Sequence, residues 1–89
     1  MRFEWDRAKA EANRRKHRVI FDEAATVFFD PLSVTIPDPD QSRGERRFVS
    51  MGISSNGRLL VVAHTEQGAV LRLISARPAS AAERKRYEA

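Results

Sequence analysis

The sequence contains no cysteine, and its 89 residues include only four glycines, four prolines, one tryptophan and one tyrosine. Without cysteine the chain has neither disulfides nor thiolate ligands for a metal, so a reducing compartment is permitted. No apolar run approaches the length that spans a membrane, and residues 1–17 lack the hydrophobic segment of a signal peptide. We therefore expect a soluble, cytoplasmic protein of one domain, residues 1–89, that uses no metal and no cofactor.

Positive charge is what the chain has in excess. Sixteen lysines and arginines against twelve acids give a formal net charge of +4 and a pI near 10.3. Six cations surround a single acid, Glu11, in the first predicted helix: Arg7, Lys9, Arg14, Arg15, Lys16 and Arg18. This field favours RNA, DNA or an acidic protein as a partner, whereas the plainer interpretation is a solvated helix face.

The first third of the chain predicts two helices. Asp6 is a suitable N-cap for a helix over residues 7–17, and Trp5 before it can pack on the first turn. A second, short helix is expected after Phe21, with Asp22 as its cap and Pro31 as its end. Its predicted buried face consists of Ala24, Ala25, Val27 and Phe28.

The rest of the sequence predicts strands and a final helix. Residues 32–36 alternate as a strand, and residues 37–45 are typical of an exposed loop. Strands over residues 46–55 and 58–65 flank Asn56-Gly57, a signal for a two-residue hairpin turn, and a turn through residues 66–68 leads to a fourth strand. Ser80 and Glu83 form a capping box for a helix over residues 81–88.

These elements predict an α+β fold with two N-terminal helices, a four-stranded antiparallel meander and one C-terminal helix. Residues 2–5 are a candidate for an extra short strand. The Asn56-Gly57 turn assigns the core face of the sheet to Val49, Met51, Ile53, Leu60, Val62 and His64. The next turn decides the face of Arg72, which lies with Thr65 after a two-residue loop and with His64 after a three-residue loop. In a regular strand Arg77 takes the face opposite Arg72 or lies beyond the strand end.

A strand with two arginines suggests chemistry on phosphate. RNA cleavage needs a base for the 2′-hydroxyl, cations around the crowded phosphate and an acid for the departing 5′-oxygen. The planar fork of Arg72 or Arg77 suits the second task, and His64 or Glu66 suits proton transfer. Lys9 and Tyr87 can also hold or protonate oxygens.

Each of these residues also has a structural interpretation. His64 continues an apolar strand and fits a partly buried packing residue, and Glu66 in a turn fits a solvated acid. Arg77 can form an ion pair with Glu83 or Glu88. Trp5 is assigned to packing or to stacking on RNA, with packing favoured.

The motifs together resemble the BrnT family of bacterial type II toxins over residues 3–88. The resemblance rests on the opening W-D-x-x-K-x-x-x-N-x-x-K-H, the segment R-x-I-S-A-R and the closing E-R-x-x-Y. The family usually has glycine after K-H, where this chain has Arg18, so the turn that leaves the first helix is expected to differ or to be strained.

The resemblance implies a RelE-like ribonuclease that cleaves RNA and inhibits translation in the bacterial cytoplasm. It also implies a BrnA-like antitoxin that neutralises the toxin and binds operator DNA. The candidate catalytic residues are Lys9, His64, Glu66, Arg72 and Arg77, and the candidate RNA-binding residues are Trp5, Asn13, Lys16 and Tyr87. The alternative is a non-catalytic basic module that binds nucleic acid or protein.

Overall fold

The computed structural model describes residues 1–38 and 46–89, so most of the predicted loop over residues 37–45 lies outside the described residues. Within these ranges, the elements are β1 (Arg2–Trp5), α1 (Arg7–His17), α2 (Phe21–Thr26), the 3₁₀ helix η1 (Val27–Phe29), β2 (Val34–Pro37), β3 (Arg47–Ile53), β4 (Leu59–Gln67), β5 (Val70–Pro78) and α3 (Ala81–Glu88). The predicted α+β class is confirmed. No helix in the described ranges has the length and apolarity needed to cross a membrane.

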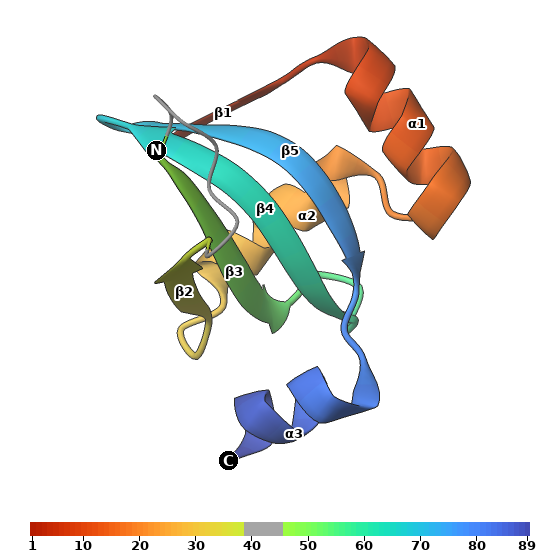
Figure 1. Cartoon of the computed structure of the whole chain (residues 1–89), viewed down its shortest axis with the longest axis vertical. Helices are drawn as coiled ribbons and strands as arrows, with labels where there is room; N and C mark the ends of the chain where they lie inside the picture. Colours follow the sequence, from red (N-terminus) through yellow and green to blue (C-terminus); the bar gives the residue numbers. More distant parts are fainter. Residues whose placement is uncertain (39–45) are drawn as a thin grey trace.

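In the described part of the chain the sheet has five strands in the order β1-β5-β4-β3-β2, and β1 runs parallel to β5 (Figure 1). The prediction of a four-stranded antiparallel meander was therefore wrong, although residues 2–5 do form the extra short strand. The two strands of the parallel pair come from opposite ends of the chain, and local sequence patterns do not report such a contact.

The capping residues explain where the helices begin. The Asp6 side chain accepts a hydrogen bond from the Lys9 amide at the start of α1, as predicted. The Ser80 capping box of α3 is also confirmed. α2 begins one residue before the predicted cap Asp22, with Ile20 at the N-cap position and no side-chain bond there. It passes into η1 before Pro31. Ala24, Ala25 and Val27 are buried as predicted, whereas Phe28 is only partly buried.

The hairpin between β3 and β4 has a longer loop than the sequence suggested. The Ser54 amide donates to the Arg58 carbonyl, which leaves three loop residues, and Gly57 has φ of 77° while Asn56 does not have positive φ. One additional loop residue reverses the orientation of every β3 side chain relative to β4. The prediction that Val49, Met51 and Ile53 face the core was therefore wrong.

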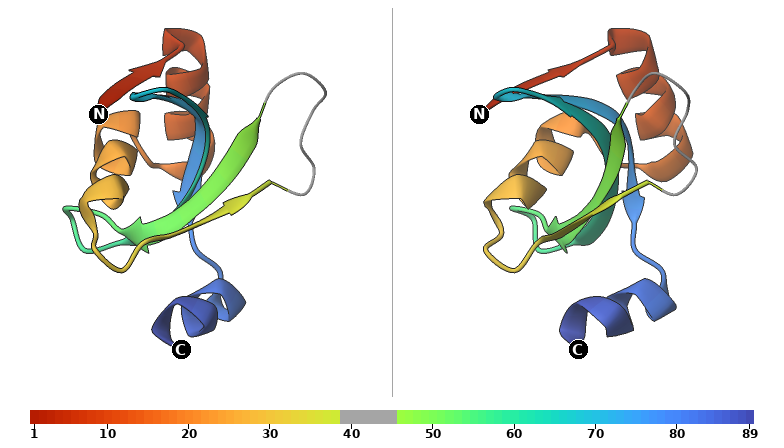
Figure 2. Two further views of the ribbon diagram at one scale, coloured as in Figure 1. Left: turned by 90° about the vertical axis from the view of Figure 1, so that its left-hand side faces the viewer. Right: turned by 60° about the vertical axis from the view of Figure 1, so that its left-hand side comes forward.

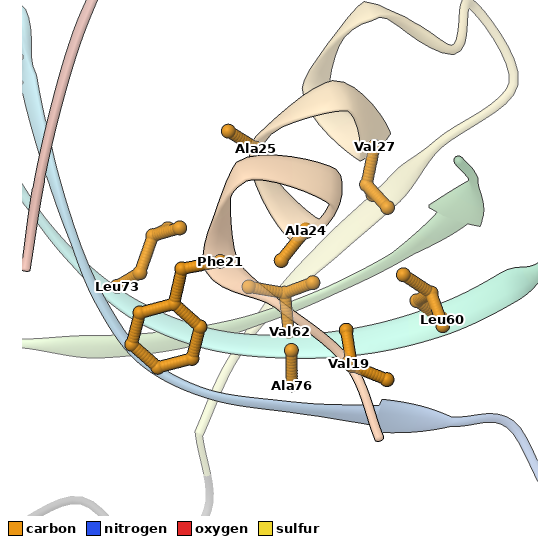
Figure 3. Close-up of a cluster of buried hydrophobic side chains, with 9 residues drawn as sticks. All are labelled: Val19, Phe21, Ala24, Ala25, Val27, Leu60, Val62, Leu73 and Ala76. Carbon is orange, nitrogen blue, oxygen red and sulfur yellow. The ribbon is translucent and has the colours of Figure 1, made fainter. Parts of the chain in front are cut away.

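The core lies between α2 and one face of the sheet, which we call the covered face. Figure 3 shows Ala24 of α2 and Val27 of η1 directed toward strand residues Leu60 and Val62. The strand residues of the covered face include Phe48, Ser50, Gly52, Leu60, Val62, His64, Leu73 and Ala76. Figure 2 shows α2 on one side of the curved sheet and α3 standing apart beneath it.

A buried ion pair joins α2 to the loop between β3 and β4. The Arg58 guanidinium contacts both carboxylate oxygens of Glu23, with Nε–Oε2 at 3.0 Å and Nη2–Oε1 at 2.5 Å. The Ser54 hydroxyl donates to the same carboxylate, and Arg58 also donates to the Arg18 carbonyl. These contacts, Arg58 first, lower the pKa of Glu23 to about 2. The pair therefore holds the helix against the hairpin.

Candidate functional site

A β-bulge in β5 places Arg72 and Arg77 on the same face of the sheet. Arg72 pairs with Thr65 on β4. Arg77 pairs with Val61, because Ile74 is an extra residue without a partner at the register shift. Thr65 and Val61 are an even number of residues apart on a regular strand, so their side chains point the same way. The expectation that the two arginines lie on opposite faces was therefore wrong.

The face that carries both arginines is opposite the covered face, and we call it the open face. Its strand side chains are Arg47, Val49, Met51, Val61, Ala63, Thr65, Arg72, Ser75 and Arg77. The second hairpin has a two-residue loop, Gly68–Ala69, with φ of 62° at Gly68. This loop places Arg72 with Thr65, which is one of the two orientations considered from the sequence.

Arg72 is available to a ligand on this face. Its side chain is 50% exposed, and its nearest acid is Glu4, whose Oε1 lies 3.5 Å from Nη1. Glu4 lies beside Arg72 because β1 and β5 pair in parallel. An exposed ion pair of this length contributes little to stability, so the guanidinium can turn toward another anion at small cost.

Arg77, in contrast, already has a carboxylate partner. Its Nη1 and Nη2 donate to the two oxygens of Glu83 at 2.8 and 2.9 Å. The Ser80 amide donates to the same carboxylate. The Arg77 bonds and the Ser80 amide lower the pKa of Glu83 to about 2. Arg77 therefore forms the ion pair that the sequence offered as an alternative, and it joins β5 to the first turn of α3.

His64 lies on the covered face, away from both arginines. Its ring is fully buried, with Nε2 2.8 Å from the Ser50 hydroxyl and an edge-on contact to Phe28. Burial lowers the pKa of His64, an effect that the nearby Glu66 carboxylate opposes in part. Glu66 is exposed near the end of β4, with Oε2 3.8 Å from His64 Nδ1. The two residues thus lie together, but on the other side of the sheet from Arg72.

A chain of hydroxyls connects His64 to the edge of the sheet. The Ser50 hydroxyl lies 2.6 Å from the Thr35 hydroxyl on β2, the outermost strand. Among the described residues Nδ1 of His64 has no hydrogen-bond partner. A buried, neutral imidazole in this position fits the packing interpretation, and it cannot touch RNA unless the side chains that cover it move.

Asn13 has a structural position that the sequence did not suggest. Its amide oxygen accepts from the Ala76 amide and its amide nitrogen donates to the carbonyls of Ala76 and Val19, at 2.9 to 3.0 Å. It therefore bonds the edge of β5 where the shorter β1 has ended, as a neighbouring strand would. A buried amide that is used in this way is not free to bind RNA.

The other predicted binding residues are scattered over the molecule. Trp5 packs edge-on against Phe21, with ring centroids 5.8 Å apart, which agrees with a packing role. Lys9 and Lys16 are exposed on α1, which lies beside the outer edge of β5 (Figure 1). The structure therefore does not bring the N-terminal candidates together with Arg72.

Tyr87 anchors the far end of α3. Its hydroxyl donates to Asp30 Oδ2 at 2.5 Å, and this bond raises the pKa of Tyr87 to about 12. Asp30 also accepts from the amides of Ile53 and Leu32, which lowers its own pKa. Tyr87 and Arg77 thus hold the two ends of a helix that has no buried residue.

Comparison with known proteins gives the family. A sequence profile described as the ribonuclease toxin BrnT of type II toxin–antitoxin systems matches residues 5–83. The chain belongs to the BrnT family. No curated protein sequence gives a significant match.

A solved structure has a fold similar to that of this chain. The crystal structure of the ribonuclease toxin BrnT from Brucella abortus matches with a TM-score of 0.65 over 90% of this chain and 97% of that one. The two sequences are 23% identical, so this similarity concerns the fold. The BrnT fold here comprises three α-helices and a five-stranded mixed sheet within the described residues.

Sequence reasoning missed three polar residues of this BrnT-family protein that face Arg72 or lie beside it. Arg47 and Thr65 form a pair across β3 and β4, and Ser75 lies between Arg72 and Arg77 on the open face. The incorrect hairpin register assigned Arg47 on β3 to the wrong face, and without the bulge in β5 Ser75 would lie on the face opposite Arg72. A three-residue loop with glycine in the last position would have placed Arg47 correctly.

Proposed function

We propose that this BrnT-family protein is an endoribonuclease that requires no metal ion and binds RNA on the open face of the sheet. Arg72 is the observation that carries the proposal. It is a half-exposed guanidinium in the middle of the sheet, on the face that α2 does not cover. Arginine matches a phosphate with two parallel hydrogen bonds, and its charge persists at every physiological pH.

The proposed reaction is transesterification within the RNA. The 2′-oxygen attacks the adjacent phosphorus, the bond to the 5′-oxygen breaks, and the products are a 2′,3′-cyclic phosphate and a 5′-hydroxyl. Negative charge grows on the non-bridging oxygens as the transition state forms, and Arg72 stabilises it there. His64 and Glu66 lie on the covered face, Lys9 lies on α1 and Tyr87 lies on α3, and their roles in the proton transfers stay predictions.

The wider role that we propose follows the family. RNA cleavage by a RelE-like toxin would inhibit translation, and a BrnA-like antitoxin would neutralise it and connect it to operator DNA. An apolar hollow of about 370 Å³ lies between the open face and α3 and offers a surface for such a protein. Its lining includes Val34 and Ile36 of the edge strand, each 50% exposed.

Cleavage of RNA by purified protein in the presence of a chelator tests the proposal. We expect Arg72→Ala to lower the cleavage rate roughly a hundredfold, as for the loss of one donor to a transition-state oxyanion. Arg15→Ala is the matched control, because it removes the same charge from an exposed position on α1. Both variants should melt at the wild-type temperature.

Three outcomes would contradict the proposal. Cleavage at the wild-type rate by Arg72→Ala would remove Arg72 from the mechanism. Loss of cleavage on chelation, with recovery on adding a divalent cation, would exclude the metal-independent reaction. RNA that is bound in a salt-dependent manner but stays intact would favour the non-catalytic binding module. Growth arrest that a neighbouring small gene relieves would support the antitoxin assignment.

A further inference from the structure

Arg47 is a second cation on the open face and lies level with Arg72. Thr65 pairs with Arg47 on one side and with Arg72 on the other, so the three residues form one row across β3, β4 and β5. Directly paired residues point to the same side of a sheet. The two arginines therefore flank the Thr65 side chain.

The Arg47 side chain contains a donor without an acceptor. Its Nε is buried and has no hydrogen-bond partner among the described residues. A buried N–H without a partner costs free energy, and a charged one costs more. The Thr65 hydroxyl also makes no side-chain hydrogen bond within the described part of the chain. The Thr65 hydroxyl and the terminal nitrogens of Arg47 thus have no acceptor among the described residues, whereas the buried Nε of Arg47 becomes available only if its side chain moves.

The spacing of the row suits a single anion. Strands two places apart in a sheet are separated by roughly 10 Å. Two arginine side chains that start at this separation can both reach an anion held over the residue between them. A phosphate has the charge and the oxygen atoms to accept from two guanidinium forks and one hydroxyl.

We propose that Arg47, Thr65 and Arg72 form one phosphate-binding site for the RNA backbone, with Arg47 as a substrate-binding residue. This inference rests on the proposed function for its ligand, and it adds a residue and a geometry to it. Among the described residues, two acids adjoin the row: Glu4, which lies 3.5 Å from Arg72, and Asp38, which follows β2 and whose amide donates to the Arg47 carbonyl. A bound phosphate displaces Glu4 from Arg72, so Glu4 weakens RNA binding.

The neighbouring Arg46 provides a matched control. Its guanidinium carbon lies 5.5 Å from the centre of the Phe48 ring, and Phe48 pairs with His64 on the covered face. Arg46→Ala and Arg47→Ala therefore remove the same charge from adjacent positions, but on opposite sides of the sheet.

The experiment measures binding of a 2′-deoxy-substituted RNA oligonucleotide, which cannot be cleaved, over a range of salt concentrations. We expect Arg47→Ala to weaken binding roughly tenfold at low salt, as for the loss of charge-assisted hydrogen bonds. In a plot of the logarithm of the binding constant against the logarithm of the salt concentration, the steepness of the slope should decrease by about 0.7, the value for one phosphate contact on a single strand. Arg47→Lys should recover part of the affinity, and Glu4→Gln should increase it above wild type.

Equal losses of oligonucleotide affinity in Arg46→Ala and Arg47→Ala would overturn the proposed site, because they would show a general effect of charge. Wild-type affinity and salt dependence in Arg47→Ala would overturn it as well. The two proposals fail separately. If the protein binds the oligonucleotide through Arg47 but never cleaves RNA, the proposed function is contradicted and the phosphate-binding site is not. Cleavage that Arg72 supports and Arg47 does not affect contradicts the site alone.

Discussion

Removal of the Arg58 side chain should destabilise the protein strongly, because it leaves the Glu23 carboxylate buried without its cation. Glu23 keeps only 5% of its side chain exposed, and Arg58 supplies two of its hydrogen bonds. The depression of the Glu23 pKa from 4.5 to about 2 corresponds to roughly 3 kcal/mol. The Arg58 side chain is 39% exposed, so solvent screening reduces this value. We expect Arg58→Ala to cost about 2–3 kcal/mol.

Thermal unfolding at pH 7 measures this cost, which should lower Tm by roughly 10–20 °C for a chain of this size. The control is Arg84→Ala, whose partner Glu88 lies 3.7 Å away with both side chains more than half exposed. It should leave Tm nearly unchanged. Glu23→Gln combined with Arg58→Ala should recover part of the loss, since the double variant has no buried charge.

The pH dependence gives a second check on the same ion pair. A depressed carboxylate pKa stabilises the folded state above the unfolded value near 4.5, and this contribution disappears as the pH falls toward 2. The difference between wild type and Arg58→Ala should therefore shrink over that range. A deficit below about 0.5 kcal/mol at pH 7, or one of equal size at pH 7 and pH 2.5, would refute the reasoning.

Two further predictions concern the N-terminal helix. Arg18 follows α1 with φ of 58° and ψ of 37°, a left-handed conformation that is less favourable for other residues than for glycine. Arg18→Gly should therefore raise the free energy of unfolding by about 0.5–1 kcal/mol in denaturant titrations. A loss of stability would show that the Arg18 side chain matters more than its backbone. Asn13→Ala should lower the free energy of unfolding by about 2–3 kcal/mol and speed hydrogen exchange at the Ala76 amide, which loses its acceptor. An Ala76 amide that stays protected would contradict the strand-like role of Asn13.

The sequence was informative where structure depends on near neighbours. The N-cap Asp6 and the Ser80–Glu83 capping box each act over three residues, and both are present. A different or strained turn at Arg18 was also expected from the family resemblance, because a residue with a Cβ atom replaces the usual glycine and takes a positive φ. The Asn56-Gly57 signal gave the right hairpin but the wrong loop, since loops of two and three residues both accept glycine there.

The sequence by itself determined where α1 and α3 begin, the existence of the strands, the family and the excess of positive charge. The tertiary structure alone decided which cations share a surface. Arg72 and Arg77 face the same way because a bulge adds one residue, and Arg47 joins Arg72 because a hairpin loop is one residue longer. Side chains alternate along a strand, so a single residue in a turn or bulge redirects every side chain beyond it. Both features lie in hairpins of consecutive strands, where the local sequence accepts loops of two or three residues and a regular or bulged strand, so the choice depends on which face of the sheet packs against α2.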